Sequence, residues 1–413
     1  MSKPFEFKFL KEVGVLGISN LMNAASNGLI IIQLNKYLSP DQSGVFLYLL
    51  AIASPIFVFF GFDLRRKITI NQLDGLDLKE IFSLRNFLSI FGFFLFMIVG
   101  FVFTKYDLVF LVALATIGIG KIFDTATESN HAIYQYYNFE NKIFVSRALK
   151  LVLSCLAFLI GGRNNFYTVF SLFVILNALP VFIIDIKIIK RLLPQISLLG
   201  FRMNSEKAID FIKVNSGLAL GSLIMVLTQN VPTYFIKYYL DYSSVTYFSS
   251  VNYILQAVYV GGGAGLGYAM LKKFRNSDSK NLKIHIPLLG KTSLMSLVTY
   301  TLFGGIFYAC NGLTLLFGAH YASVYSLFFI LLYSGYFFTV SSFLNNFLLF
   351  CDKKSLVFKL RISRILLIVT LCFLFPYCSL SINSFGYALL ATNCTDCILH
   401  AILIRKEVYK NSI

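Results

Sequence analysis

The chain has no tryptophan, and charged residues make up only 13% of its 413 residues. A soluble domain has about a quarter of its residues charged. Hydrophobic residues make up 57% of the sequence, which is more apolar surface than a single water-soluble core can bury. Without tryptophan, tyrosine and phenylalanine must supply the aromatic groups at a membrane interface. The composition therefore indicates an integral membrane protein.

Cysteine and histidine are few and scattered, which argues against a metal centre and against catalysis. There are seven cysteines, and Cys394 and Cys397 lie one helical turn apart without a second pair of ligands. The four histidines are far apart in the sequence and form no recognisable catalytic arrangement with serine or aspartate. No nucleotide-binding motif is present. We therefore expect a protein that is not an enzyme and that has no cofactor and no metal.

Lysine and arginine alternate along the chain, because every second connector between apolar runs is basic. All but four of the 36 basic residues lie in five connectors and at the two ends of the chain. The exceptions are Lys36, Lys105, Arg163 and Lys237. Because cytoplasmic loops carry the excess of lysine and arginine, this pattern predicts that both termini are cytoplasmic. Membrane topology and anionic lipid headgroups then explain the net charge of +17, so no nucleic-acid partner is expected.

A membrane-spanning helix needs about 20 mostly apolar residues, and the sequence has about twelve such runs. They lie near residues 13–34, 43–62, 86–104, 107–129, 145–162, 166–186, 214–236, 245–270, 288–309, 322–349, 362–380 and 384–404. The connectors between them are short, so the sequence predicts an all-α polytopic membrane protein without an extramembrane domain.

The longest polar connector, at 187–213, divides the spans into six plus six, which is a common transporter layout. We therefore expect a six-helix lobe at 1–190, a cytoplasmic linker at 191–212 and a second six-helix lobe at 213–413. A weak internal similarity supports this division. Residues 38–46 read LSPDQSGVF before the second span, and residues 240–248 read LDYSSVTYF before the eighth.

Ionisable groups inside a membrane are costly and are candidates for function. In the fourth span, Lys121, Asp124, Glu128 and His131 recur at spacings of three and four and therefore share one helix face. One interpretation is a charged stripe that lines a cavity, with Asp124 and Glu128 as candidates for coupling to H⁺ or Na⁺. The other is an ion-pair network within the helix, close to the cytoplasmic interface.

Amides form a second polar feature, because Asn20, Asn23 and Asn27 share one face of the first span. They could bind sugar hydroxyls in a cavity, or they could join neighbouring helices. The other candidates for substrate binding are Arg65, Arg66, Lys121, Lys213, Asn215, Asn252 and Gln256. Arg65 and Arg66 could equally act as topology signals. The glycine run at 261–267 predicts a hinge, and a structural ion pair is expected between an arginine near 361–364 and Asp396.

Several segments resemble the multidrug/oligosaccharidyl-lipid/polysaccharide exporter superfamily, specifically its bacterial Wzx-type O-unit flippases. Residues 38–46, followed by an apolar run into Gly61 and Phe62, resemble the family signature LGPxxYGxF between its first two spans. In this chain Ser39 stands where the family has glycine, and Ser43 stands where it has an aromatic residue. Residues 316–322, LFGAHYA, resemble the family element LFGxxYxxA, and 209–253 resembles the start of the family's second half.

This resemblance implies two six-helix lobes around a V-shaped, MATE-like cavity, in the inner membrane of a bacterium. It implies a flippase that moves an undecaprenyl-pyrophosphate-linked sugar repeat unit, such as an O-antigen unit of lipopolysaccharide, to the periplasmic leaflet by alternating access. A polysaccharide polymerase and a chain-length regulator would then be candidate partners. An ion-coupled drug or cation antiporter of the same superfamily is the main alternative. A major-facilitator carrier and a membrane enzyme of glycan assembly are further alternatives.

Overall fold

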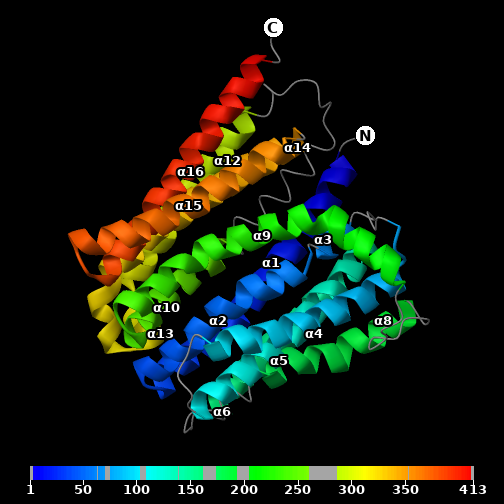
Figure 1. The fold of residues 1–413 in the computed structure, drawn as a ribbon, viewed down its shortest axis with the longest axis horizontal. Coiled ribbons are helices and arrows are strands. Elements are labelled where there is room, and N and C mark those ends of the chain that lie inside the picture. Colours follow the sequence, from blue (N-terminus) through cyan, green and yellow to red (C-terminus); the bar gives the residue numbers. More distant parts are fainter. Residues whose placement is uncertain are drawn as a thin grey trace. The chain divides into compact units, whose positions relative to one another are not determined.

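The computed structural model describes residues 3–62, 64–69, 75–102, 108–137, 139–160, 174–192, 204–259, 286–351 and 353–410 (Figure 1). These parts of the chain are helical, and no strand occurs among them. The predicted all-α fold class is therefore confirmed. The glycine run at 261–267 and His285 lie outside the described residues.

In the first half of the chain the helices are α1 (Lys3–Tyr37), α2 (Pro40–Phe60), α3 (Leu64–Thr69), α4 (Leu78–Val102), α5 (Leu108–Tyr136) and α6 (Glu140–Ile160). Residues 174–180 are also helical and continue into the π-helix η1 (Val181–Asp185) and α8 (Ile186–Leu192).

In the second half they are α9 (Ser205–Tyr239), α10 (Tyr242–Val258), α12 (Ile286–Ala309), α13 (Gly312–Phe317), the 3-10 helix η4 (Ala319–Val324), α14 (Tyr325–Phe350), α15 (Lys354–Cys378) and α16 (Ile382–Lys410). Each of the twelve predicted spans overlaps a helix at the residues that the structure describes.

Seven of the described helical segments are long and apolar enough to cross a membrane. The outer face of α4 shows why they need lipid. Phe87, Phe91, Phe94 and Ile98 recur at helical spacing, and each side chain is more than half exposed. A soluble protein rarely exposes such a continuous apolar stripe. The opposite face packs inward through Phe96, which is fully buried.

Glycine allows α4 and α5 to approach each other closely. A Cβ atom on Gly100 of α4 would lie 2.2 Å from Leu114 Cδ1 of α5. A Cβ atom on Gly118 of α5 would lie 2.7 Å from the ring of Phe93 on α4. Small residues at such contacts let membrane helices pack backbone against backbone.

The two similar segments found in the sequence adopt the same local structure. Ser39 caps α2 by accepting from the Gln42 backbone, and Gln42 returns a capping-box contact to Ser39. Asp241 caps α10 in the same way, by accepting from Ser244 N at 2.6 Å. The helices that precede these caps, α1 and α9, each contain 35 residues. The similarity between the two segments thus extends to the helix caps and to the lengths of the preceding helices.

Contacts divide the chain into two compact units. One comprises Ala25–Asn230, and the other comprises Met1–Ala24 together with Val231–Ile413. The boundaries therefore fall inside α1 and inside α9. The division into lobes at the 191–212 connector stays a prediction.

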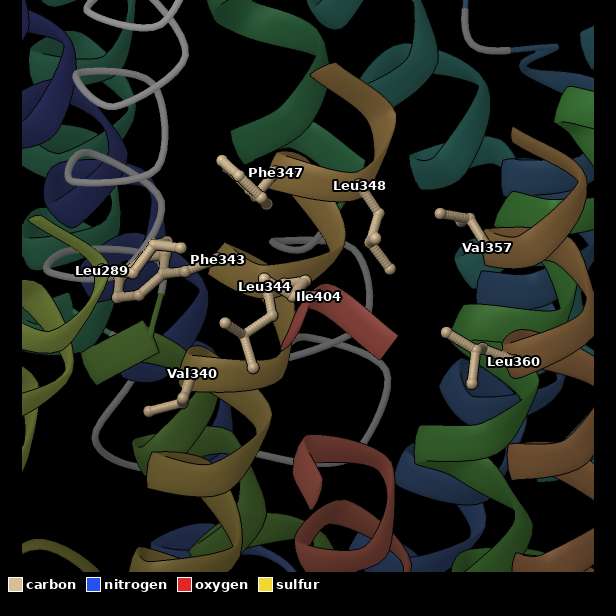
Figure 2. Close-up of a cluster of buried hydrophobic side chains, with 9 residues drawn as sticks. All are labelled: Leu289, Val340, Phe343, Leu344, Phe347, Leu348, Val357, Leu360 and Ile404. Atoms are coloured by element: carbon tan, nitrogen blue, oxygen red, sulfur yellow. The ribbon is translucent and has the colours of Figure 1, made fainter. Parts of the chain in front are cut away.

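The second of these units is built around α14. Its apolar positions recur along one stripe and meet side chains from α12, α15 and α16 (Figure 2). The buried cluster consists of Leu289, Val340, Phe343, Leu344, Phe347, Leu348, Val357, Leu360 and Ile404. Since α14 packs on both α15 and α16, it forms the centre of this core.

Candidate functional site

A group of charged side chains gathers in the unit formed by Ala25–Asn230. It joins three elements, because α3 and α6 both pack on α5. We call it the basic cluster, and it consists of Arg65 from α3, Lys121, Asp124 and Glu128 from α5, and Arg147 and Lys150 from α6.

A sharp turn after α2 brings Arg65 to α5. Phe62 adopts a φ of 45°, in the left-handed region that side chains other than glycine rarely occupy. Its ring is 3% exposed and packs near the ring of Phe59, at 5.7 Å between centroids. This buried aromatic anchor fixes the turn, and α3 then runs along α5.

Glu128 is the centre of the cluster. Arg147 Nη2 lies 3.2 Å from Glu128 Oε1, and Arg65 donates to Glu128 Oε2. Each carboxylate oxygen therefore receives a different guanidinium group. Arg147 is only 4% exposed, so this arrangement compensates a charge that is almost removed from solvent.

Lys121 and Asp124 form the second pair of the cluster, with 3.3 Å between Lys121 Nζ and Asp124 Oδ2. Lys150, which is 7% exposed, interacts electrostatically with Asp124 and with Glu128. The spacing of the α5 residues predicted that they would share a helix face, and the structure bears this out.

The charges of the basic cluster do not balance. Among the described members of the cluster, four cationic side chains, from Arg65, Lys121, Arg147 and Lys150, accompany two carboxylates. Two of the four cations are more than nine-tenths buried. A buried cationic excess is costly unless an anion accompanies it, so the arrangement is suited to an anionic ligand.

Arg85 is a further buried cation, but its contacts suggest a structural role. Its Nη1 donates to Ala126 O on α5 at 3.3 Å, and its Nη2 donates to Asn86 Oδ1 at 2.8 Å. Its guanidinium group also lies over the Phe82 ring, at 5.0 Å. Arg85 therefore fastens α4 to α5.

The remaining candidates are distributed over α1, α9 and α10. Asn20, Asn23, Asn27 and Asn252 are partly buried, while Lys213 and Gln256 are exposed. Asn215 is buried, and its amide nitrogen donates to Phe211 O of its own helix at 2.8 Å. The side chain of Arg66 lies outside the part of the structure that is described. None of these placements assigns a ligand.

Sequence reasoning did not connect Arg147 and Lys150 with the α5 stripe. Both were counted among the basic residues that indicate topology. Their spacing of three residues within α6 places them on one helix face, and this signal could have marked them. Their meeting with Glu128 and Asp124 depends on tertiary packing.

A second polar group, which we call the C-terminal polar network, joins α14, α15 and α16. Arg364 Nη1 lies 3.3 Å from Asp396 Oδ2, which confirms the predicted ion pair between adjacent spans. Arg364 Nη2 donates to Asn393 Oδ1 at 2.5 Å, and Asn393 Nδ2 donates to Ser334 Oγ at 2.8 Å. Ser341 also donates to Asp396. Because this buried pair is neutral overall and also bonds to Asn393 and Ser341, it suits a structural role.

Comparison with known proteins gives the fold. No family model and no curated protein matches the sequence. A multidrug-resistance MATE transporter of the MOP superfamily, solved facing inward, is similar with a TM-score of 0.67 at 14% identity, over 95% of each chain. A eukaryotic MATE transporter is similar with a TM-score of 0.67 at 13% identity, over 98% of each chain. A Vibrio cholerae MATE transporter is similar with a TM-score of 0.60 at 12% identity, over 97% of each chain.

The chain therefore has the fold of the MATE transporters, which is a multi-pass helical fold. The resemblance found in the sequence is supported at the level of the fold. The O-unit flippase subtype, the inner-membrane location and the orientation of the termini stay predictions.

Proposed function

We propose that this chain is a membrane transporter that works by alternating access and carries an anionic lipid-linked cargo. Its cargo would be undecaprenyl pyrophosphate bearing a sugar repeat unit, and it would flip this lipid to the periplasmic leaflet. The MATE-like fold supports transport, and the cationic excess of the basic cluster is the observation that favours an anionic cargo.

The chemistry of a pyrophosphate fits this cluster. A diphosphate that leaves water for the membrane interior needs charge-assisted hydrogen bonds in place of its hydration shell. Arginine offers planar, bidentate donors to phosphate oxygens, and lysine adds a compact charge. In this proposal Arg65 and Arg147 hold the diphosphate, with Lys121 and Lys150 beside it. Glu128 keeps the two guanidinium groups in place when the cargo is absent.

The amide-bearing helices supply the other half of the proposal. Asn20, Asn23, Asn27 and Asn252 are partly exposed, and amide groups both donate to and accept from sugar hydroxyls. The glycan would contact them, while the polyprenyl tail remains in lipid. A polysaccharide polymerase and a chain-length regulator would act on the flipped product.

The second candidate is an ion-coupled drug or cation antiporter, and the comparisons match it better by name. Two of the similar structures are described as multidrug-resistance transporters. Asp124 and Glu128 would then bind the coupling H⁺ or Na⁺. A cationic ligand would have to compete with Arg65 and Arg147 for Glu128, which is the physical argument against this candidate.

Depletion of the protein in its bacterial host distinguishes the two candidates. We expect a complete single repeat unit on undecaprenyl pyrophosphate to accumulate on the cytoplasmic side, detected by mass spectrometry of extracted lipids with side-specific labelling. An unchanged lipid pool together with increased sensitivity to cationic drugs would support the antiporter.

A matched pair of arginine variants then tests the basic cluster. Arg147→Gln removes a buried cation of the cluster, whereas Arg191→Gln removes an exposed cation of the same unit. We expect complementation of the depleted strain to fail with Arg147→Gln and to succeed with Arg191→Gln, at equal amounts of folded protein. Equal complementation by both would contradict a cationic cargo site.

A further inference from the structure

A carboxyl group outside the basic cluster lies in an unusual stretch of backbone. Asp185 is the last residue of η1, a π-helix that follows Pro180, and it is fully buried. The Ile186 N–H bonds to Val181 O, five residues earlier, so the hydrogen-bonded loop is one residue longer than in an α-helix. Such π-turns inside α-helices frequently occur at functional sites, because they redirect a side chain.

The groups that meet Asp185 are neutral hydrogen-bonding side chains. Tyr134 Oη of α5 donates to Asp185 Oδ1 at 3.0 Å. Asn130 of α5 and Ser146 of α6 also interact with the carboxyl group. All three partners are at most 1% exposed. The carboxyl group is therefore surrounded by buried polar side chains from two neighbouring helices.

The hydrogen bonding of this pocket is incomplete. Among the described residues, Asp185 Oδ2 has no hydrogen bond of normal distance and angle, and the Asn130 amide interacts with the carboxyl group without reaching that geometry. Buried polar atoms rarely remain unpaired, so a missing partner needs an explanation. A proton on Oδ2 turns this oxygen into a donor, and the amide of Asn130, which interacts with the carboxyl group, can accept through its oxygen.

The charged groups on the neighbouring elements do not neutralise Asp185. On α6, Arg147 pairs with Glu128 at 3.2 Å, and Lys150 interacts with Asp124. On α8, Lys187, Lys190 and Arg191 are exposed, and on α5 the buried His131 ring lies 5.9 Å from the Tyr134 ring. No ion pair of Asp185 occurs in the described parts of the chain. A buried carboxylate without a cation is costly, and a proton is the smallest cation that can accompany it.

We propose that Asp185 is a proton-binding site whose proton exchanges during the transport cycle. Asp185 Oδ2 takes up one proton, and the resulting acid donates to Asn130 while it continues to accept from Tyr134. Release returns the same proton to water and leaves the carboxylate held by Tyr134 and Ser146. Tyr134 and Asn130 are positioning residues. The site is separate from the basic cluster, so the proposal holds for a glycan cargo and for a drug cargo.

Infrared spectroscopy of the purified protein in lipid nanodiscs tests the proposal without any cargo. We expect the wild type at neutral pH to show the carbonyl band of a buried carboxylic acid and Asp185→Asn to lack it. Asp210→Asn, which removes an exposed carboxyl group of the same unit, is the matched control and should keep the band. Identical spectra of the wild type and Asp185→Asn in this region would overturn the proposal.

Asp185→Asn retains a carbonyl oxygen that can accept from Tyr134, so the fold should survive. If it does not, Tyr134→Phe keeps Asp185 and removes only the hydrogen bond to Oδ1. We expect the carbonyl band to move to higher frequency in this variant, because a carbonyl that loses a hydrogen bond stiffens. A band unchanged by Tyr134→Phe would mean that it does not come from Asp185, and the proposal would fail.

Proteoliposomes test exchange across the membrane. With a pH gradient and a pH-sensitive dye inside, we expect proton flux through the wild type and Asp210→Asn, and a loss of at least tenfold in Asp185→Asn. A separate measurement tests sodium binding. If sodium ions raise the thermal unfolding temperature of the wild type but not that of Asp185→Asn, the site binds sodium and the proton assignment is overturned.

Discussion

Replacement of Glu128 by glutamine tests the basic cluster most directly, because it should change stability and anion affinity in opposite directions. Glu128→Gln preserves the size of the side chain and removes one negative charge between Arg65 and Arg147. The cluster then contains four cations and one carboxylate. The protein should become less stable, while its affinity for an anion should rise.

The size of the stability loss follows from burial. Removing one partner of a fully buried ion pair costs about 3–5 kcal/mol, whereas a hydrogen bond to a charged group contributes about 1.5–3 kcal/mol. Arg147 is 4% exposed, but the Glu128 side chain is 34% exposed, so water screens part of the lost attraction. We therefore expect Glu128→Gln to lower the free energy of unfolding by about 2 kcal/mol.

The gain in anion affinity has an electrostatic origin. Glu128 repels a phosphate group that approaches the two guanidinium groups, and glutamine does not. Even with a high effective dielectric constant, removal of one charge a few ångströms away should tighten pyrophosphate binding by about tenfold. Inorganic pyrophosphate is a suitable probe, because it carries the charged part of the proposed cargo without its lipid or sugar.

Thermal unfolding in nanodiscs, with and without pyrophosphate, measures both effects on the same sample. Glu80→Gln is the control, since Glu80 pairs with the exposed Lys207 at 3.5 Å and should contribute less than about 1 kcal/mol. Weaker pyrophosphate binding by Glu128→Gln would refute the reasoning. The antiporter, in which Glu128 binds the coupling ion, would be favoured by a different result. Glu128→Gln would then lose drug efflux, and pyrophosphate would change the thermal unfolding of neither the wild type nor this variant.

Two further variants test the framework of the second unit by reversible unfolding in mixed micelles. Asp396→Asn leaves the buried Arg364 without its carboxylate and should cost about 3–5 kcal/mol, and a cost below 1 kcal/mol would mean that Arg364 is not held by this pair. Asp241→Ala removes the cap that accepts from Ser244 N and should cost about 1 kcal/mol, with an unchanged stability showing that α10 needs no cap.

The parts of the fold that the sequence predicted correctly depend on local patterns. Apolar runs long enough to cross a membrane became helices, because a backbone in lipid must satisfy its own hydrogen bonds. The Lys121, Asp124 and Glu128 stripe was predictable for the same reason, since helical periodicity alone places residues three and four apart on one face.

The partners of that stripe were not predictable from local patterns. Arg65 and Arg147 reach Glu128 from α3 and α6, and nothing in the local sequence of either helix specifies this contact. Asn215 shows the opposite difficulty. It has the composition expected of a cavity residue, yet its amide donates to the carbonyl of Phe211 one turn earlier. A side-chain amide in a helix can hydrogen-bond either to a ligand or to a backbone carbonyl of its own helix, and the sequence does not show which.

Asp185 shows a third limit of sequence reasoning, and it also shows how the two polar groups of the first unit differ. In the sequence, Asp185 is a single acidic residue within an apolar run, and no residue pattern there predicts a π-turn. Glu128 is surrounded by cations, and Asp185 meets neutral donors, although both carboxyl groups contact α5 or lie on it. The same helix can therefore support two tasks. In our proposals, the helical turn that carries Glu128 holds arginine side chains for an anionic ligand. The turn that carries Tyr134 contacts the Asp185 carboxyl group, which binds a proton.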